Sequence, residues 1–375
     1  MRRAAMVPSW GHEIKNGWFF NNGGRDERQP RYCIKKYFED NGVAMDTIDL
    51  VDIKSCDGVI VFNIGIKDIP VLLALWYHRK LHKTIYYPVE PSVTTPIHQR
   101  GKLKKIAQMF GKVLTWSDDL VDDQKFFKLP IGIVTQEFRT GQPFASKKLL
   151  TMISGANYSA DPHELYSKRI EAIRYFEKAY PDQFAFYGKR WVQGEFSSYK
   201  GTVEDKHDVY KDYKFAICYE NARHMNGWIT EKIFDCFYSG VVPVYWGPDN
   251  VEEYIPRECF IDKRQFVSYE ELSTYLINMT EEEYSCRILA IKDFLGSQRY
   301  RQFTPMYFAR TFYDHLMDIE SVKFSYFVAA VNLICLIKWL RFPEGIGVPF
   351  LRKIVRTWGR IRDVSFGTDS KRIRI

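Results

Sequence analysis

The sequence predicts an α/β protein of two Rossmann-like domains that face a cleft, followed by a C-terminal helical tail. Two observations support this fold class. The 375 residues, 46% of them hydrophobic and 27% charged, have a globular composition and suffice for two domains of roughly 150 residues plus a tail. In both halves, short apolar runs alternate with longer amphipathic segments, which is the pattern of βαβ units.

In the first half, three apolar runs predict buried strands over residues 58–62, 83–87 and 112–116. Two amphipathic segments between them predict helices. The helix over 69–82 has Pro70 near its first turn, where a proline fits, and the helix over 99–110 would end at Gly111. This order of elements predicts a parallel sheet with crossover helices.

The second half repeats this pattern. Its predicted strands are residues 149–153, 184–187, 215–219 and 241–246. Asp161 can cap a helix whose first residue is Pro162, and Glu164 can close a capping box. A second helix is introduced by Gly227 and ends at Gly240. Ligands of open α/β sheets gather at the carboxyl ends of strands, so we expect the site there.

These patterns predict domains at residues 1–145 and 146–315 and a tail at 316–375. Residues 324–340 are apolar and aromatic but shorter than the ~20 residues of a membrane-spanning helix. Residues 350–364 place apolar side chains on one helical face and basic ones over the rest. Such a basic amphipathic helix favours an anionic membrane surface; a helix packed on the domains with a solvated basic face is the alternative.

Charge and cysteine content limit the classes of partner and location. The formal net charge of +8 fits an anionic ligand or membrane, whereas nucleic acid is not expected, because no stacking motif accompanies the charge.

The seven cysteines form no CxxC pair, so we expect reduced thiols. Residues 1–18 hold no apolar run long enough for a signal peptide. We therefore expect a cytoplasmic protein, peripheral on the inner face of the membrane.

The most informative stretch lies in the second half. One predicted strand ends in Glu220 and Asn221, and the next helix begins with Thr230, Glu231 and Lys232. The free N–H groups and the dipole of a helix N-terminus suit a diphosphate. A lysine is unfavourable there, and an anionic ligand would resolve the conflict. The alternative to a ligand site is that Glu231 simply complements the helix dipole and that Lys232 points to solvent.

The run YEN…TEKIFDCFYSGVVPVYWG closely resembles the donor-binding signature of the α-1,3-fucosyltransferases, glycosyltransferase family 10, of the bacterial type. The resemblance covers roughly residues 30–310. It implies a GT-B fold, with GDP-fucose in the C-terminal domain and the acceptor, a GlcNAc-containing glycan, mainly against the N-terminal one. It also implies transfer with inversion at the anomeric carbon and no required metal or other cofactor.

The resemblance assigns roles in the first domain. Glu90 falls on the family's catalytic glutamate and would take the proton from the acceptor hydroxyl, although many members have Glu-Ser-Pro where this chain has Glu-Pro-Ser. A surface loop carboxylate is the alternative. His98 lies near Glu90 in the sequence and is expected to contact the acceptor, unless it is structural. Asp118 and Asp119 imitate a metal-binding pair, but we interpret them as helix-capping residues.

The resemblance also assigns donor-binding residues. Arg169 and Lys232 would bind the diphosphate, with Arg190 and Lys189 as weaker alternatives for the arginine. Arg169 could instead form a salt bridge on the helix surface.

The remaining donor contacts concern hydroxyl groups and rings. Asn221 and Glu231 would contact the ribose or fucose hydroxyls. Trp228 stands where relatives usually have tyrosine, and its ring could stack on the donor.

The resulting prediction is inverting transfer of fucose to a glycan in an α-1,3 linkage, in protein glycosylation or surface polysaccharide synthesis. Two alternatives remain open. One is a related GT-B transferase that uses another nucleotide sugar, and the other is a non-catalytic glycan-binding protein.

Overall fold

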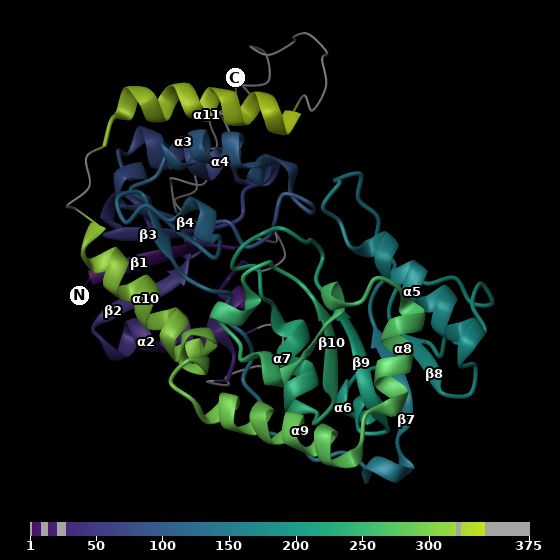
Figure 1. Ribbon diagram of the computed structural model, residues 1–375. Helices are drawn as coiled ribbons and strands as arrows, with labels where there is room; N and C mark the ends of the chain where they lie inside the picture. Colours follow the sequence, from purple (N-terminus) through teal and green to yellow (C-terminus); the bar gives the residue numbers. More distant parts are fainter. Residues whose placement is uncertain (1, 9–13, 21–27, 320–323, 342–375) are drawn as a thin grey trace. The chain divides into compact units, whose positions relative to one another are not determined.

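The computed structural model describes residues 2–8, 14–20, 28–319 and 324–341, and the chain forms two compact units (Figure 1). The first unit contains residues up to 115, residues 120–129 and the chain from 308 onward; the second contains residues 116–119 and 130–307. Each unit has its own parallel sheet.

The sheet of the first unit has six strands, all parallel, with β3 and β4 at its centre. In spatial order they are β2 (Val43–Thr47), β1 (Arg2–Val7), β3 (Gly58–Phe62), β4 (Thr84–Tyr87), β5 (Lys112–Thr115) and β6 (Phe126–Lys128). Every residue of β3 is buried, as expected for a strand covered on both faces. The three strands predicted in this half are confirmed, and the structure adds β1, β2 and β6.

Helices cover this sheet. They are α1 (Gly17–Phe20), α2 (Pro30–Asp40), α3 (Ile69–Tyr77), α4 (Arg100–Ala107), α10 (Pro305–Met317) and α11 (Tyr326–Arg341). Helix α3 ends five residues earlier than predicted. Arg79 adopts a left-handed conformation with φ 53°, which ends the helical path, and residues 81–83 form a 3₁₀ turn instead.

The sheet of the second unit has five parallel strands. In spatial order they are β11 (Ile261–Asp262), β10 (Val242–Trp246), β9 (Tyr213–Tyr219), β7 (Lys148–Ile153) and β8 (Phe184–Tyr187). All four strands predicted here are confirmed to within two residues at each end. The helices of this unit are α5 (Tyr166–Ala179), α6 (His207–Tyr210), α7 (Glu231–Tyr238), α8 (Tyr269–Asn278) and α9 (Glu281–Gly296).

The predicted start of α5 is wrong. The helix begins at Tyr166 and not at Pro162, because the preceding backbone pairs with the residues that follow β9. Leu165 donates its N–H to the carbonyl of Asn221 at 3.0 Å, and Glu164 forms an antiparallel bridge with Ala222. The Glu164 carboxylate still serves the helix start, where it accepts a hydrogen bond from the N–H of Ser167 at 2.9 Å.

The division of the chain differs from the predicted domain boundaries at both ends of the second domain. Residues 130–145 pack on the second unit: the N–H of Ile133 donates to Phe303 O at 3.0 Å, and that of Arg139 to Tyr238 O at 2.7 Å. After residue 307 the chain returns to the first unit. There α11 packs on α3 and α4 (Figure 1). The predicted basic helix at 350–364 lies outside the described residues.

Two further observations concern the described part of the chain. None of its helices combines the length and the hydropathy that crossing a bilayer requires. None of the seven cysteines, all of which lie within the described ranges, forms a disulfide.

Helix α10 packs closely on the central strand β3. Phe312 lies 5.3 Å from Phe62 between ring centroids, and Leu316 is 3% exposed. A Cβ atom added to Gly58, the first residue of β3, would lie 2.7 Å from Cγ of Leu316. Only glycine at this position lets the helix approach so closely.

We therefore expect Gly58→Ala to lower the free energy of unfolding by about 1–3 kcal/mol, because the added methyl group overpacks the contact. Leu316→Ala should cost about 2–5 kcal/mol through the cavity it leaves. The double variant should be less destabilised than the sum of the two, since the missing leucine makes room for the methyl group. Urea denaturation of the four proteins measures this coupling. Strict additivity would contradict the contact.

Candidate functional site

A cavity of about 400 Å³ opens in the second unit. It lies where strands β7, β8 and β9 end and helix α7 begins, which is the edge at which open parallel sheets bind ligands. Five of the six predicted donor-binding residues line it, namely Arg169, Arg190, Asn221, Glu231 and Lys232. Residues that are far apart in the sequence thus converge on one cavity, as predicted.

The charges that line the cavity are unbalanced. Five of the lining residues are basic, and Glu231 is the one acidic residue. The predicted Lys189 is among the basic residues, and so is Lys206, which sequence reasoning missed. Lys206 pairs with Asp235 at 2.5 Å. An excess of positive charge at a helix N-terminus suits a ligand that carries more than one negative charge.

The wholly buried carboxylate of Glu220 lies at the start of α7. It accepts hydrogen bonds from the backbone N–H of Thr230 at 2.9 Å, the hydroxyl of Thr230 at 2.8 Å and the hydroxyl of Tyr245 at 3.1 Å. The ammonium of Lys232 lies 3.2 Å from it. Glu220 therefore serves as the anion of this helix N-terminus and as the partner of the lysine.

This arrangement corrects the expectation that a ligand is needed to balance Lys232. Burial alone would lower the pKa of this lysine, but Glu220 and Glu231 outweigh burial and raise it, so the ammonium stays charged. Lys232 also donates to the Thr230 hydroxyl at 2.9 Å. Glu220 was not among the predicted site residues, although a charged residue that directly follows an apolar strand could have signalled it.

Arg169 also lies at the end of strand β9, and the residue is 4% exposed. Its Nη2 donates to the carbonyls of Tyr219 at 2.7 Å and Glu220 at 2.9 Å, and to Asn221 Oδ1 at 3.2 Å. The predicted alternative, a salt bridge on the helix surface, is wrong, because Glu171 pairs with Lys168 and not with Arg169. Arg169 fixes the end of β9 and also lines the cavity.

Glu231 differs from Glu220 in its exposure, since 54% of its side chain is accessible. Partial desolvation of its carboxylate opposes ionisation, but Lys232 and Lys206 outweigh this effect and lower the pKa of Glu231. The group is an ionised acceptor at the cavity wall. That property fits the predicted contact with a sugar hydroxyl.

Trp228 does not line the cavity, so the predicted stacking on the donor does not agree with the structure. Its ring is 3% exposed and packs on Trp116 with the centroids 4.6 Å apart. The apolar indole is buried against another indole, which is the more favourable place for so large an apolar surface.

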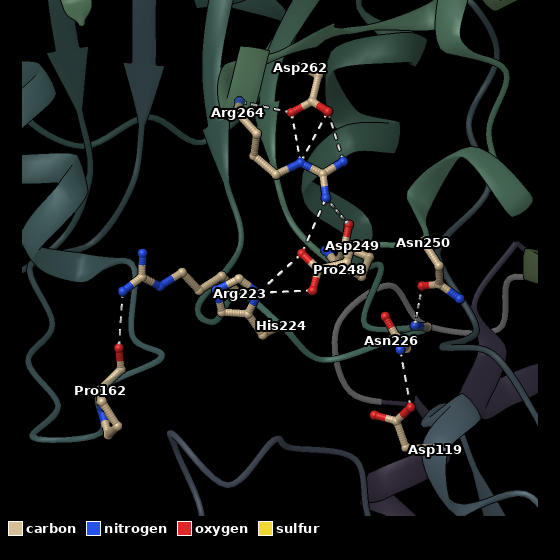
Figure 2. A network of polar contacts seen from close by, with 11 residues as sticks. Asp119, Pro162, Arg223, His224, Asn226, Pro248, Asp249, Asn250, Asp262 and Arg264 are labelled. Atoms are coloured by element: carbon tan, nitrogen blue, oxygen red, sulfur yellow. Dashed lines mark hydrogen bonds and ion pairs between the residues drawn. The ribbon is translucent and has the colours of Figure 1, made fainter. Parts of the chain in front are cut away.

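The loop between β9 and α7 is fixed by polar contacts on both sides (Figure 2). Arg223 donates to the carbonyl of Pro162 at 3.3 Å, and His224 contacts the carboxylate of Asp249 at 2.9 Å. Arg264 in turn contacts Asp249 at 3.3 Å. These contacts hold the loop that carries Asn221 toward the cavity.

The two adjacent aspartates at 118 and 119 belong to the second unit, where they accept hydrogen bonds from this loop and from the segment after β10. Asp118 accepts hydrogen bonds from Asn250 at 2.8 Å and Tyr254 at 2.6 Å. Asp119 accepts one from Asn226 at 3.1 Å (Figure 2). They begin a 3₁₀ turn and do not cap an α-helix as predicted. Within the described ranges, no group of three or more His, Cys, Asp or Glu side chains could hold a metal ion.

Glu90 and His98 lie together in the first unit, after β4. Nδ1 of His98 donates to the carbonyl of Glu90 at 2.6 Å, so the ring accepts from the Tyr86 hydroxyl at Nε2, also at 2.6 Å. The ring is 6% exposed, and burial lowers the pKa of His98 to about 4. The prediction that His98 contacts an acceptor does not agree with this burial. The imidazole instead fixes the backbone of Glu90.

Residues 147–287 match the family model of the C-terminal domain of glycosyltransferase family 10 (fucosyltransferase). The alpha-(1,3)-fucosyltransferase FucT of Helicobacter pylori is 32% identical over 74 residues, 20% of this chain and 15% of that protein. The 4-galactosyl-N-acetylglucosaminide 3-alpha-L-fucosyltransferase 9 of Mus musculus is 45% identical over 190 residues, 49% of this chain and 47% of that protein. The chain spans less than half the length of these curated relatives.

Solved structures extend the likeness of fold to most of the chain. A crystal structure of an alpha1,3-fucosyltransferase matches with a TM-score of 0.53 and 14% identity, over 87% of this chain and 92% of the other. The same kind of enzyme with GDP-fucose matches with a TM-score of 0.50 and 13% identity, over 86% and 92%. The two parallel-sheet units form the GT-B fold that the sequence predicted.

The cavity and the family match occupy the same part of the chain. The cavity is lined by residues between 152 and 232, all within the matched segment. Residues 147–287, which include every residue that lines the cavity, are therefore similar to the C-terminal domain of glycosyltransferase family 10 (fucosyltransferase).

Proposed function

We propose that the protein transfers fucose from GDP-fucose to a GlcNAc-containing glycan, with inversion and in an α-1,3 linkage. The cavity carries this proposal: its basic residues exceed its acidic ones by four, and they converge on the start of α7 within a family 10 domain. The name of the mouse relative, a 4-galactosyl-N-acetylglucosaminide 3-alpha-L-fucosyltransferase, supports this acceptor class and linkage.

In the proposed reaction the oxygen of an acceptor hydroxyl forms a bond to the anomeric carbon of fucose. The bond from that carbon to the diphosphate breaks, and its electron pair leaves with GDP. Lys232 and Arg169 stabilise the charge that accumulates on the diphosphate. Glu90 takes the proton of the attacking hydroxyl. Asn221 and Glu231 accept hydrogen bonds from sugar hydroxyls.

Mass spectrometry of the products tests this function. The purified protein is incubated with GDP-fucose, GDP-mannose or UDP-galactose and a panel of lactosamine-type acceptors, with and without a chelator. We expect one deoxyhexose to be added, from GDP-fucose alone. Transfer of another sugar would favour the related transferase, and binding of acceptor without any transfer would favour the glycan-binding protein.

Glu90→Gln should lower turnover by about 10²–10⁴-fold, because the amide cannot take the proton of the acceptor hydroxyl. Its GDP affinity should match that of the wild type, since the cavity is built from the other unit. The matched control is Glu39→Gln on α2, a surface carboxylate paired with Lys35 at 2.7 Å. If the turnover of Glu90→Gln lies within a few-fold of this control, Glu90 is not the catalytic base.

Lys232→Gln should weaken GDP binding about tenfold or more, because a charge-assisted hydrogen bond to the diphosphate is lost. Lys168→Gln is the control: its lysine lies one position before Arg169 but pairs with Glu171. Calorimetric titration with GDP measures both affinities, and urea denaturation verifies that both variants are folded. Equal affinities of wild type and Lys232→Gln would contradict the assignment of this lysine.

The buried His98 should make stability depend on pH. Its pKa is about 4 when folded and 6.5 in an unfolded chain, so the unfolded state binds the extra proton between these values. The difference corresponds to about 3 kcal/mol, present above pH 6.5 and lost as the pH falls toward 4.

Urea denaturation at several pH values compares the wild type with His98→Gln, which cannot titrate. The difference between the two free energies of unfolding should shrink by about that amount over this range. A difference that does not vary with pH would show that His98 is not held neutral.

A further inference from the structure

Helix α11 covers α3 and α4 with one face and leaves an apolar stripe on the other. Figure 1 shows α11 lying across these two helices in the first unit. Its buried face consists of Ala329, Leu333, Leu336 and Ile337. On the opposite face Phe327 is 79% exposed, Val331 45% and Ile334 57%. These three positions follow the spacing of one helix face, so the exposed residues form a continuous stripe.

The surface around this stripe is basic. Helices α3, α4 and α11 contain no Asp or Glu. The basic residues on these helices and on the turn after α3 include Arg79, Arg100, Lys102, Lys104, Lys105, Lys338 and Arg341. Arg79 lies over the ring of Tyr326 at 5.7 Å and Lys105 over that of Trp339 at 5.9 Å. The turn after α3 and helix α4 thus each bring a cation to a ring of α11, the helix that carries the stripe.

We propose that this α11 face docks on an anionic lipid surface. A helix face with large apolar side chains bordered by cations matches the boundary between acyl chains and headgroups. The apolar side chains would enter that boundary, while the cations would contact lipid phosphates. A second copy of the chain fits the stripe less well, because two such faces would bring like charges together.

The proposal is independent of the transfer reaction and of the cavity, which lies in the other unit. It concerns other residues than the predicted basic helix at 350–364, which follows α11 along the chain. Substitutions confined to α11 and α4 separate the two surfaces, because they leave residues 350–364 unchanged.

The test is co-sedimentation of the full chain with vesicles. The wild type should bind vesicles that contain phosphatidylglycerol, bind pure phosphatidylcholine vesicles much more weakly, and be released at high salt. Phe327→Ser with Ile334→Ser should reduce the affinity for anionic vesicles about tenfold or more. Lys104→Gln with Lys105→Gln should reduce it about tenfold.

Matched controls come from the second unit. Val267→Ser removes an apolar side chain that is 98% exposed, and Arg174→Gln with Lys178→Gln removes two exposed cations from α5. Neither should change vesicle binding. Because all the substituted side chains are accessible to solvent, urea midpoints should stay near that of the wild type.

Three outcomes would overturn the proposal. The wild type could fail to bind anionic vesicles. The α11 variants could bind as tightly as the controls, which would assign binding to another part of the chain. Analytical ultracentrifugation could show a dimer that the Phe327 and Ile334 variants abolish, which would assign the stripe to a second copy.

Discussion

The candidate site depends on one buried charge, the carboxylate of Glu220. It lies between the end of β9 and the start of α7, where it accepts hydrogen bonds from Thr230 and Tyr245 and neutralises Lys232. A buried carboxylate without these partners would be strongly unfavourable, so the four groups stabilise one arrangement together. The backbone carbonyl of the same residue accepts from Arg169. Both proposed diphosphate-binding cations are therefore positioned by Glu220.

This constraint explains how positive charge is kept at a helix N-terminus. Lys232 would destabilise the isolated helix, but Glu220 offsets the repulsion at short range. The other cations of the cavity are held by separate contacts, since Lys206 pairs with Asp235 and Arg190 donates to Asn157 at 2.6 Å. These four cations, Lys232, Arg169, Lys206 and Arg190, are held in place before a ligand arrives, which lowers the entropy cost of binding.

Much of the fold could be predicted because strands of parallel sheets are buried on both faces and read as apolar runs. The strand β3 coincides with its prediction, and β8 does as well. The start of α5 could not be predicted: the capping residues at 161–164 are present, but the backbone of residues 163–165 pairs with residues 221–223 of a distant segment. Local signals at that point compete with a tertiary contact, and the contact prevails.

The site was predictable to a similar degree. The charged residues of the TEK run and Arg169 line one cavity, because their positions follow from strand ends and a helix start. The burial of Trp228 and His98 was not predicted, since nothing in the sequence shows that Trp228 packs on a partner ring or that His98 has two hydrogen-bond partners in the core. The place of Glu220 directly after an apolar strand could have marked it as a site residue, but its hydrogen bond with Tyr245 of the neighbouring strand could not be predicted, because that contact depends on the tertiary fold.

The most direct test of this account is a crystal structure of the protein with bound GDP. We expect the diphosphate within hydrogen-bonding distance of Lys232 Nζ and the Arg169 guanidinium, with Glu220 still bound to Thr230 and Tyr245. A diphosphate bound elsewhere, or a Lys232 ammonium that keeps only its contacts with Glu220 and Thr230, would contradict it.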